Sequence, residues 1–380
     1  MKILHTADWH LASPLTCRLS EAQARERRNE LLSRFADMVQ YAKAQDVCAV
    51  LICGDISDGG VLPFQIQDYL CDVMQNAAPI RFFLIPGNHD CILGSDAAAN
   101  PTIGGIFSAG RFAVRGGLPE NITVFGDAWE TVPLLDGVTV SGRATAPTEK
   151  PLVPTVPSDA YHIVMLHGAV RQTETQTDAY DIDMSAMAQH HIDYLALGHY
   201  HSFQHGKLDQ RGTWCYPGCP EGRGFDECGD KGFVLLTLNR DLSRGNPYVA
   251  QAEFIPFAKR RFHRVPLNIK DIPDSMQALE KAALLAVKEI PETDFIRVIL
   301  CGEEEPETVR DIEYLQKRLS EKFYYAEVTD ERKTRLNPEK YQYDISLRGE
   351  FVRRVMRSSL SDEEKADILH CGLAALRGEN

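Results

Sequence analysis

The sequence predicts an α/β fold in which layered sheets carry helices on their outer faces, followed by a smaller α+β unit. Three observations support this prediction. Short apolar strand patterns alternate with amphipathic helix patterns over the first 90 residues, and strand patterns dominate from there to about residue 240. Beyond residue 266, helix and strand patterns alternate again over a shorter stretch. A length of 380 residues allows two or three domains.

The first elements have clear boundaries in the sequence. Ile3–His5 and Val50–Cys53 are apolar runs typical of short buried strands. Between them we expect a helix at Ser20–Gln45, because Ser20 and Gln23 match a capping box. Apolar residues within it recur at helical spacing and predict one buried face, made of Leu31, Leu32, Phe35, Met38, Val39 and Ala42.

The pattern continues with a second helix and then with strands. We expect the helix at Phe64–Gln75. The expected strands are Arg81–Ile85, Thr123–Phe125, Thr139–Ser141, Ile163–Leu166, Tyr194–Leu197 and Phe233–Leu238.

The C-terminal third has its own set of elements. The expected order is a helix at Ser275–Lys288, a strand at Phe295–Leu300, a helix at Glu307–Lys322, a strand at Tyr324–Val328 and then the segments Phe351–Met356 and Ser361–Leu376. Ser361 and Glu364 form a second capping box, and one apolar face is expected from Ile368, Leu369, Leu373 and Leu376. We therefore predict domains at residues 1–258 and 266–345, followed by terminal helices at 346–380.

Composition and charge limit the classes of protein to which this chain can belong. The chain has 41 basic and 54 acidic residues and a net charge of −13, which argues against a protein that holds nucleic acid by its charge alone. No run of 18 apolar residues predicts a membrane span, and the N-terminus does not resemble a secretory signal. Ten cysteines without such a signal favour reduced thiols and a cytoplasmic protein. A basic cluster at 259–264 is either a solvated linker or a strip that contacts phosphates.

Five short motifs follow predicted strands, at the edge where α/β proteins build their sites. They are Asp8-Trp9-His10, Gly54-Asp55-Ile56-Ser57-Asp58, Gly87-Asn88-His89-Asp90, His167-Gly168 and Gly198-His199-Tyr200-His201. Residues two apart in an extended chain face the same side, so Asp8 and His10 can reach one metal ion together. The imidazoles, carboxylates and amide exceed the needs of one tetrahedral ion and suit two divalent cations that share a bridging carboxylate.

This order of motifs resembles the calcineurin-like metallophosphoesterase superfamily. Over about residues 1–265 the chain resembles the SbcD/YhaO-type DNA repair exonuclease branch, most clearly in its opening Ile3–Leu15 and in Tyr216–Arg223. The resemblance implies a four-layer αββα sandwich with a small C-terminal α+β domain that caps the site or selects DNA. It also implies a set of metal ligands in which Asp8, His10 and His201 hold one ion, Asn88, His167 and His199 hold the other, and Asp55 bridges them.

The resemblance further implies roles for the residues beside these ligands. His89 would face the scissile phosphate and assist the leaving oxygen, while Asp58 would orient His89. We interpret Asp90 itself as a carboxylate that stabilises the loop and not as a catalyst. A metal-bound hydroxide would attack phosphorus in line. Mn²⁺ is the expected ion, and Fe or Zn²⁺ also suits nitrogen and oxygen ligands.

The resemblance leaves the substrate and the partners open. Some SbcD-type nucleases carry His where this chain has Asp58, so a small-molecule phosphoesterase acting on a nucleotide or a phosphomonoester remains the first alternative to a DNA exonuclease. A non-catalytic scaffold protein of a repair complex is the second alternative. The family also implies that the C-terminal helices bind the coiled coil of an SbcC-type ATPase. Those helices could instead pack only on their own domain, and a homodimer is a further option.

Overall fold

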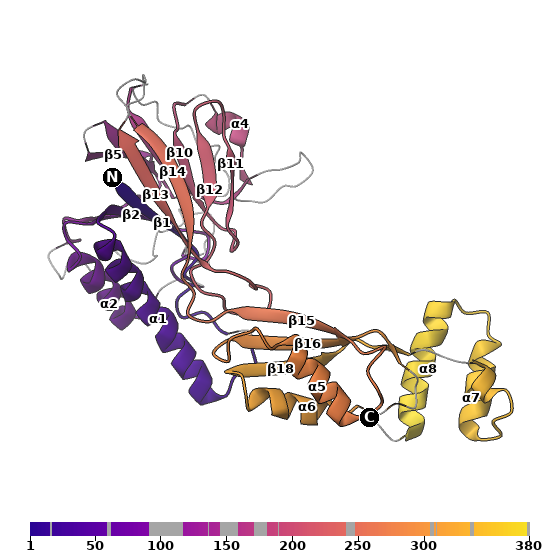
Figure 1. Cartoon of the computed structure of the whole chain (residues 1–380). Helices are drawn as coiled ribbons and strands as arrows, with labels where there is room; N and C mark the ends of the chain where they lie inside the picture. Colours follow the sequence, from indigo (N-terminus) through magenta and orange to yellow (C-terminus); the bar gives the residue numbers. More distant parts are fainter. Residues whose placement is uncertain are drawn as a thin grey trace. The chain divides into compact units, whose positions relative to one another are not determined.

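The computed structural model (Figure 1) describes every residue except 16, 59–61, 91–116, 136, 145–158, 171–180, 189, 241–247, 305–307, 309, 335–337 and 378–380. The chain forms two compact units, Met1–Arg261 and Phe262–Asn380.

The first unit contains two six-stranded mixed sheets. The first has the order β14-β13-β1-β2-β3-β4, formed by Tyr248–Pro256, Gly232–Arg240, Lys2–Thr6, Val47–Cys53, Arg81–Ile85 and Ile122–Val124. The second has the order β11-β12-β10-β7-β6-β5, formed by Gln204–Lys207, Thr213–Tyr216, Tyr194–Gly198, Tyr161–His167, Val138–Gly142 and Glu130–Leu135. Strands β1, β2 and β3 run parallel, as do β7 and β10. The carboxyl ends of each parallel set therefore lie at one sheet edge.

The alternation of side chains along β2 explains how the layers stack. Ala49, Leu51 and Cys53 belong to the core between the two sheets, together with β7 and β10 residues. Val50 and Ile52 point the other way, into a core shared with the two helices α1 (Glu21–Ala44) and α2 (Phe64–Gln75). These helices cover the outer face of the first sheet (Figure 1). The capping box of Ser20 and Gln23 is confirmed at the start of α1.

The outer face of the second sheet is also covered. Val164 and Leu166 of β7 pack there against Ile182 and against Met187 of the short helix α4 (Met184–Met187). Ile182 belongs to β9 (Asp181–Ile182), which pairs with β8 (Ala169–Val170). The expected α/β sandwich is therefore confirmed. Within the described residues, the helical layer on this side is the single turn of α4.

Several strands were not expected from the sequence, and most of them lie at sheet edges. Strands β14, β11 and β5 each pair on one side only, and alternating or exposed positions dominate their burial patterns. An edge strand needs no continuous apolar run because part of its surface faces solvent. Strand β15 (Phe262–Asn268) alternates buried or half-buried with exposed residues in the same way. The segment expected to be a linker or strip at 259–264 thus partly forms a strand.

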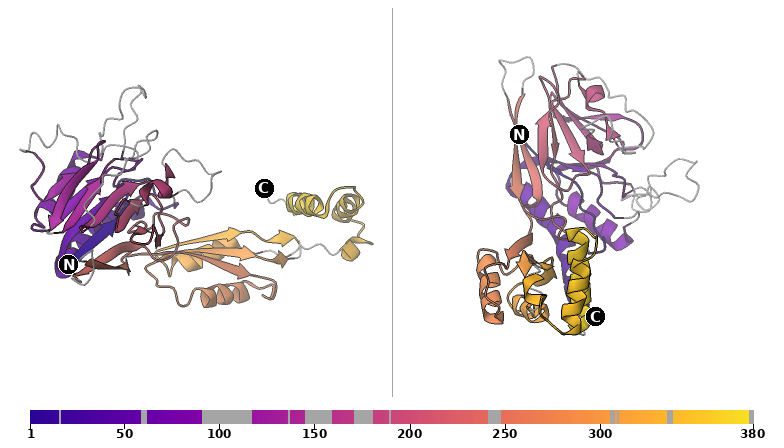
Figure 2. Two further views of the ribbon diagram at one scale, coloured as in Figure 1. Left: turned by 90° about the horizontal axis from the view of Figure 1, so that it is seen from above. Right: turned by 90° about the vertical axis from the view of Figure 1, so that its right-hand side faces the viewer.

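The second unit is a βαβαβ arrangement. Strands β15, β16 (Phe295–Cys301) and β18 (Tyr325–Asp330) are parallel neighbours. Helices α5 (Met276–Ala286) and α6 (Ile312–Ser320) pack on one face of this sheet around Ile296, Val298 and Leu300 (Figures 1 and 2). Helix α6 begins later than predicted, capped by Asp311, and Glu307 of the expected helix lies outside the described residues.

The chain ends in a small helical cluster. After β17 (Glu303–Glu304), β19 (Lys333–Thr334) and the 3₁₀ turn η1 (Pro338–Tyr341), helices α7 (Leu347–Met356) and α8 (Asp362–Arg377) follow. The second capping box is confirmed, because Ser361 and Glu364 bind each other's backbone N–H groups.

The predicted apolar face of α8 is only half correct. Leu369 and Leu373 are buried against Tyr341 and Val352. Ile368 and Leu376 are 40% and 44% exposed, because this four-residue core is too narrow to cover them. Across the described residues, we find no helix with the length and apolar character that a bilayer span requires.

Candidate metal centre

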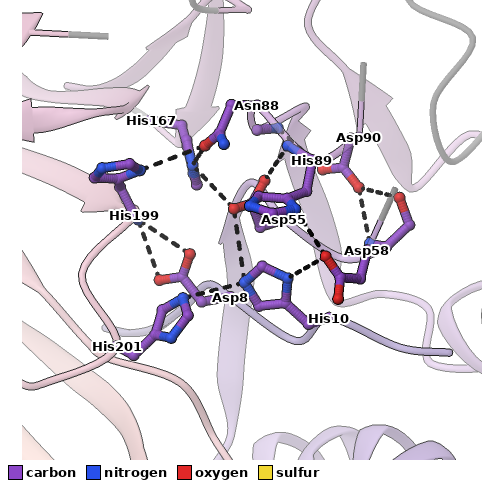
Figure 3. Close-up of polar contacts among 12 residues, drawn as sticks. Asp8, His10, Asp55, Asp58, Asn88, His89, Asp90, His167, His199 and His201 are labelled. Carbon is purple, nitrogen blue, oxygen red and sulfur yellow. Dashed lines mark hydrogen bonds and ion pairs between the residues drawn. The ribbon is translucent and has the colours of Figure 1, made fainter. Parts of the chain in front are cut away.

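The five motifs meet where the carboxyl ends of the two sheets approach each other (Figure 3). Glycine permits this approach. A Cβ added at Gly198 would stand 1.8 Å from the carbonyl oxygen of Cys53, and one at Gly87 would stand 2.2 Å from Asp55 Oδ1. Any larger side chain at these two positions would separate the backbones that carry the site.

Four of the site residues have unusual backbone angles. The φ values are 54° at Asp8, 42° at His10, 51° at Asp55 and 118° at His199. Such angles are costly for residues other than glycine and persist where the surroundings hold them. Here two hydrogen bonds join the loops, from Asp8 N to the Gly54 carbonyl at 3.0 Å and from His10 N to the Asp55 carbonyl at 2.8 Å.

One group of side chains comprises Asp8, His10 and His201, whose ligand atoms all lie within 4.8 Å of one another. The Nε2 atoms of His10 and His201 are 3.1 Å apart. The Asp8 carboxylate accepts hydrogen bonds from the backbone N–H of His199, which holds it in place. Two imidazoles and one carboxylate thus converge on one point.

A second group lies beside the first and includes Asp55, Asn88 and His167. His167 Nε2 is 2.9 Å from Asn88 Oδ1 and 3.3 Å from Asp55 Oδ2. His199 Nδ1 approaches the same Asn88 oxygen at 3.4 Å. Asp55 Oδ2 also lies 3.6 Å from His10 Nε2 of the first group. Its carboxylate therefore stands between the two groups.

The charges of the site respond to burial and to one another. Burial raises the pKa of Asp8 to about 6. Burial also acts against a charged His167, but Asp55, with smaller contributions from Asp8 and the Cys53 carbonyl, raises the pKa of His167 to about 9. Burial, together with the nearby Arg223, lowers the pKa of His10 to about 3. Neutral and cationic imidazoles thus lie side by side.

The donor set fits a divalent cation. His167 Nδ1 is 2.9 Å from the Cys53 carbonyl and must donate to it, so Nε2, which faces the oxygens of Asn88 and Asp55, is the nitrogen that gives up its proton to bind a cation. His10 Nδ1 is buried and makes no hydrogen bond in the described structure, although it lies 3.7 Å from Asp58 Oδ1. Lone pairs that face one another in this way favour a shared cation, and mixed nitrogen and oxygen donors suit a divalent transition metal.

His89 differs from the other histidines of the site. Its side chain is 43% exposed, and its Nδ1 lies 2.7 Å from Asp58 Oδ1. Its backbone N–H donates to Asp55. Asp90 is fully buried and accepts hydrogen bonds from the backbone N–H groups of Gly87 and Ser57. The structure thus brings together all the residues predicted for the site.

Two residues near the site were given no role from the sequence. Glu227 accepts a hydrogen bond from His201 Nδ1 at 2.6 Å, and the Arg223 guanidinium contacts Glu227 at 2.7 Å. Arg223 belongs to the Tyr216–Arg223 segment that carries the family resemblance. A four-residue spacing of Arg and Glu in a glycine-rich loop is too common to single out by itself.

Three cations of the basic cluster at 259–264 are paired with carboxylates, and one of them is buried. Lys259 and Arg260 both contact Glu30, and Arg261 contacts Asp230. Arg260 is only 7% exposed. The hypothesis of phosphate contacts is therefore wrong for Arg260, whose charge is buried against α1.

Two stacked sheets with this donor set at their edge have the architecture expected of a metal-dependent phosphoesterase. The family model described as calcineurin-like phosphoesterase matches residues 1–203, and the chain belongs to this family. The chain is accordingly a metal-binding hydrolase of the metallophosphoesterase class.

Three curated proteins are similar to this chain. The uncharacterized metallophosphoesterase YhaO of Bacillus subtilis is 25% identical over 249 residues, which cover 64% of this chain and 59% of YhaO. The DNA double-strand break repair protein Mre11 of Methanosarcina acetivorans is 23% identical over 251 residues, covering 63% and 37%. The SbcD component of the nuclease SbcCD of Rhodobacter capsulatus is 32% identical over 94 residues, covering 24% and 22%. The chain spans less than two thirds of each relative.

Proposed function

We propose that this protein is a two-metal phosphodiester hydrolase that acts as a DNA exonuclease in DNA repair. The observation that carries the proposal is the convergence of two donor groups on either side of Asp55, with the exposed His89 beside them. Two of the three relatives have names that refer to DNA break repair or to a nuclease, and they supply the support for DNA as the substrate.

The donor groups suggest how the metals would be held. Asp8, His10 and His201 would hold one ion, Asn88, His167 and His199 the other, and Asp55 would bridge them. The bridging role is supported by the contacts of one Asp55 oxygen with His10 at 3.6 Å and with His167 at 3.3 Å. Bound divalent ions would neutralise phosphate charge and supply a nucleophile from water near neutral pH. We propose Mn²⁺ as the ion.

His89 has the position of a general acid in this scheme. Because Nδ1 of His89 pairs with the Asp58 carboxylate, Nδ1 carries a proton and Nε2 is the ring nitrogen left for the substrate. With its side chain 43% exposed, the imidazole can meet a phosphodiester bound over the metals. It would hold a proton at Nε2 and donate that proton to the leaving oxygen.

The test is hydrolysis by the full chain with Mn²⁺, compared with the metal-free protein. The substrates are end-labelled linear double-stranded DNA, closed circular DNA, bis-p-nitrophenyl phosphate and p-nitrophenyl phosphate. The proposal expects release of nucleotides from linear DNA, none from circular DNA, and loss of activity in Asp55→Asn. Turnover of p-nitrophenyl phosphate without cleavage of DNA would overturn it. Absence of turnover on every substrate would favour the scaffold alternative.

A small-molecule phosphoesterase is the second candidate function. It is favoured by the pairing of Lys259, Arg260 and Arg261 with carboxylates, which reduces the positive charge that this part of the basic cluster offers to a DNA backbone. The salt dependence of DNA binding distinguishes the two functions. The DNA affinity of a nuclease that contacts several phosphates falls steeply as the salt concentration rises. The DNA affinity of an enzyme specific for a mononucleotide should change little with salt.

We propose further that helices α7 and α8 dock an SbcC-type coiled-coil ATPase. Ile368 and Leu376 of α8 and Leu347 of α7 expose apolar surface that could pack in the groove of a coiled coil. The test is a pull-down with such an ATPase. Deletion of residues 346–380 should abolish capture, and capture that survives the deletion would overturn the idea. Self-association of the chain alone, seen by size-exclusion chromatography, would instead indicate a homodimer.

A further inference from the structure

Glu227 lies directly behind the proposed metal ligand His201. Its Oε1 is 2.6 Å from His201 Nδ1, and the Glu227 side chain is only 5% exposed. The Arg223 Nη2 atom is 3.3 Å from the same ring nitrogen, so the carboxylate contact is the shorter one and Nδ1 is the donor. A proton at Nδ1 leaves the lone pair of Nε2 directed at His10 and Asp8.

Arg223 holds the Glu227 carboxylate through both of its oxygens. The Arg223 backbone N–H donates to Oε2 at 2.7 Å, and Nη2 donates to Oε1 at 2.7 Å. The backbone of the turn is closed by a hydrogen bond from Glu227 N to the Gly224 carbonyl at 3.0 Å. The direction of the carboxylate is therefore fixed by its hydrogen bonds.

The same guanidinium also faces the other side of the site. Arg223 Nη1 donates to Ser13 Oγ at 3.2 Å and lies 3.8 Å from Asp58 Oδ2. Asp58 in turn holds His89 through its other oxygen at 2.7 Å. Arg223 thus stands between the two carboxylates that orient a ligand histidine and the substrate-facing histidine.

We propose that Glu227 and Arg223 are positioning residues of the metal centre. Glu227 selects the His201 tautomer whose Nε2 binds metal, and Arg223 fixes Glu227 while also holding Asp58 beside His89. This inference rests on the proposed role of His201 as a metal ligand. The competing interpretation is that Arg223 and Glu227 only brace their loop as an i,i+4 ion pair.

The first experiment measures binding of Mn²⁺ alone to the full chain by isothermal titration calorimetry. Glu227→Ala should weaken Mn²⁺ binding by about 10- to 100-fold, the range seen when a carboxylate behind a ligand histidine is removed. The matched control is Asp226→Ala, which removes an acidic side chain one residue away that is exposed, and it should bind Mn²⁺ like the wild type. Equal affinity of Glu227→Ala and the wild type would overturn the inference.

A second variant protects the test against misfolding. Glu227→Ala leaves the Arg223 charge partly buried without its main partner, which can unfold a protein. The double variant Glu227→Ala/Arg223→Ala removes both charges and should fold while still binding Mn²⁺ about 10- to 100-fold more weakly. A double variant that is folded by circular dichroism and binds Mn²⁺ normally would show that the pair is only a brace.

The tautomer itself is the most direct readout. In metal-free protein labelled with ¹⁵N-histidine, the His201 resonances, assigned with His201→Ala, should show a proton on Nδ1 in the wild type. They should show loss of this preference in Glu227→Ala. If the wild-type protein binds no Mn²⁺ at all, the proposed metal centre is refuted. If the wild-type protein binds Mn²⁺ but the His201 tautomer is the same in Glu227→Ala, only the role of Glu227 is refuted.

Discussion

The role of His89 can be tested with a variant that separates leaving-group assistance from metal binding. His89→Ala removes an imidazole that is 43% exposed and whose Nδ1 contacts Asp58 at 2.7 Å. Within the described residues, no hydrogen bond is seen from the His89 side chain to any of the seven proposed ligands, and its one ring contact with them is the edge of His10. We therefore expect His89→Ala to fold and to bind Mn²⁺ with unchanged affinity.

The size of the effect follows from the chemistry of the leaving group. Proton transfer by a positioned side chain typically accelerates a reaction by about 10²–10⁴-fold. Each factor of ten corresponds to about 1.36 kcal/mol of activation free energy, so loss of His89 should raise the barrier for DNA by about 2.7–5.4 kcal/mol. p-Nitrophenolate departs without a proton. The loss on bis-p-nitrophenyl phosphate should therefore be much smaller than the loss on DNA.

The assay compares kcat of the variant and the wild type on linear DNA and on bis-p-nitrophenyl phosphate, at one Mn²⁺ concentration and one pH. His205→Ala is the control, because His205 is an exposed histidine of β11 whose ring packs near Phe203. It should retain wild-type rates on both substrates. An equal loss on both substrates in His89→Ala, or a retained rate on DNA, would refute the role of His89 as the acid.

Three other changes test the buried charges, the titration of the site and its packing. Glu30→Ala removes the partner of the buried Arg260 and should lower the free energy of unfolding by about 3–5 kcal/mol. Urea titration followed by tryptophan fluorescence measures the free energy of unfolding of the first unit, because all three tryptophans lie in it. A decrease of less than about 1 kcal/mol, the value typical of a surface ion pair, would contradict the argument that the pair is buried. Below about pH 9, His167 binds a proton in the metal-free fold, and a metal ion must displace that proton. The affinity for Mn²⁺ should therefore rise with pH up to about 9. A constant affinity between pH 7 and 9, measured by calorimetry, would exclude this role of the His167 proton. Metal-free protein should lose the matching stability as pH rises from 6.5 through 9, since the pKa of His167 is raised on folding. Gly198→Ala places a Cβ 1.8 Å from the Cys53 carbonyl oxygen. It should lower the free energy of unfolding by about 1–3 kcal/mol or more and weaken Mn²⁺ binding. Wild-type stability together with wild-type Mn²⁺ affinity would show that the two backbones can separate freely.

Much of the first unit could be predicted because its signals are local. The helix at α1 was expected from a capping box and a helical apolar face, and both are present. The expected strand at Arg81–Ile85 and the helix at Phe64–Gln75 have the observed bounds. Central strands are buried on both faces and therefore appear in the sequence as continuous apolar runs.

Other features depend on neighbours that a local pattern does not contain. The amphipathic pattern of α8 is real, but only Leu369 and Leu373 find a partner surface, so Ile368 and Leu376 stay exposed. In the sequence, the basic residues at 259–261 have no visible partners and therefore suggest a charged surface. In the folded protein, Glu30 and Asp230 lie opposite them and form ion pairs with them. The edge strands were missed because pairing on one side leaves their composition mixed.

The sequence by itself determined the chemistry available to this protein. Five motifs after strand patterns predicted the donor types and their common edge, because parallel strands bring their carboxyl ends together. Only the tertiary structure decided how these donors are held. Glu227 lies 26 residues from His201 along the chain, and Arg223 reaches Ser13 across 210 residues, so their contacts arise from folding alone. A side chain's residue type supplies its lone pairs and protons, whereas the direction in which they point is set by the packed neighbours around it.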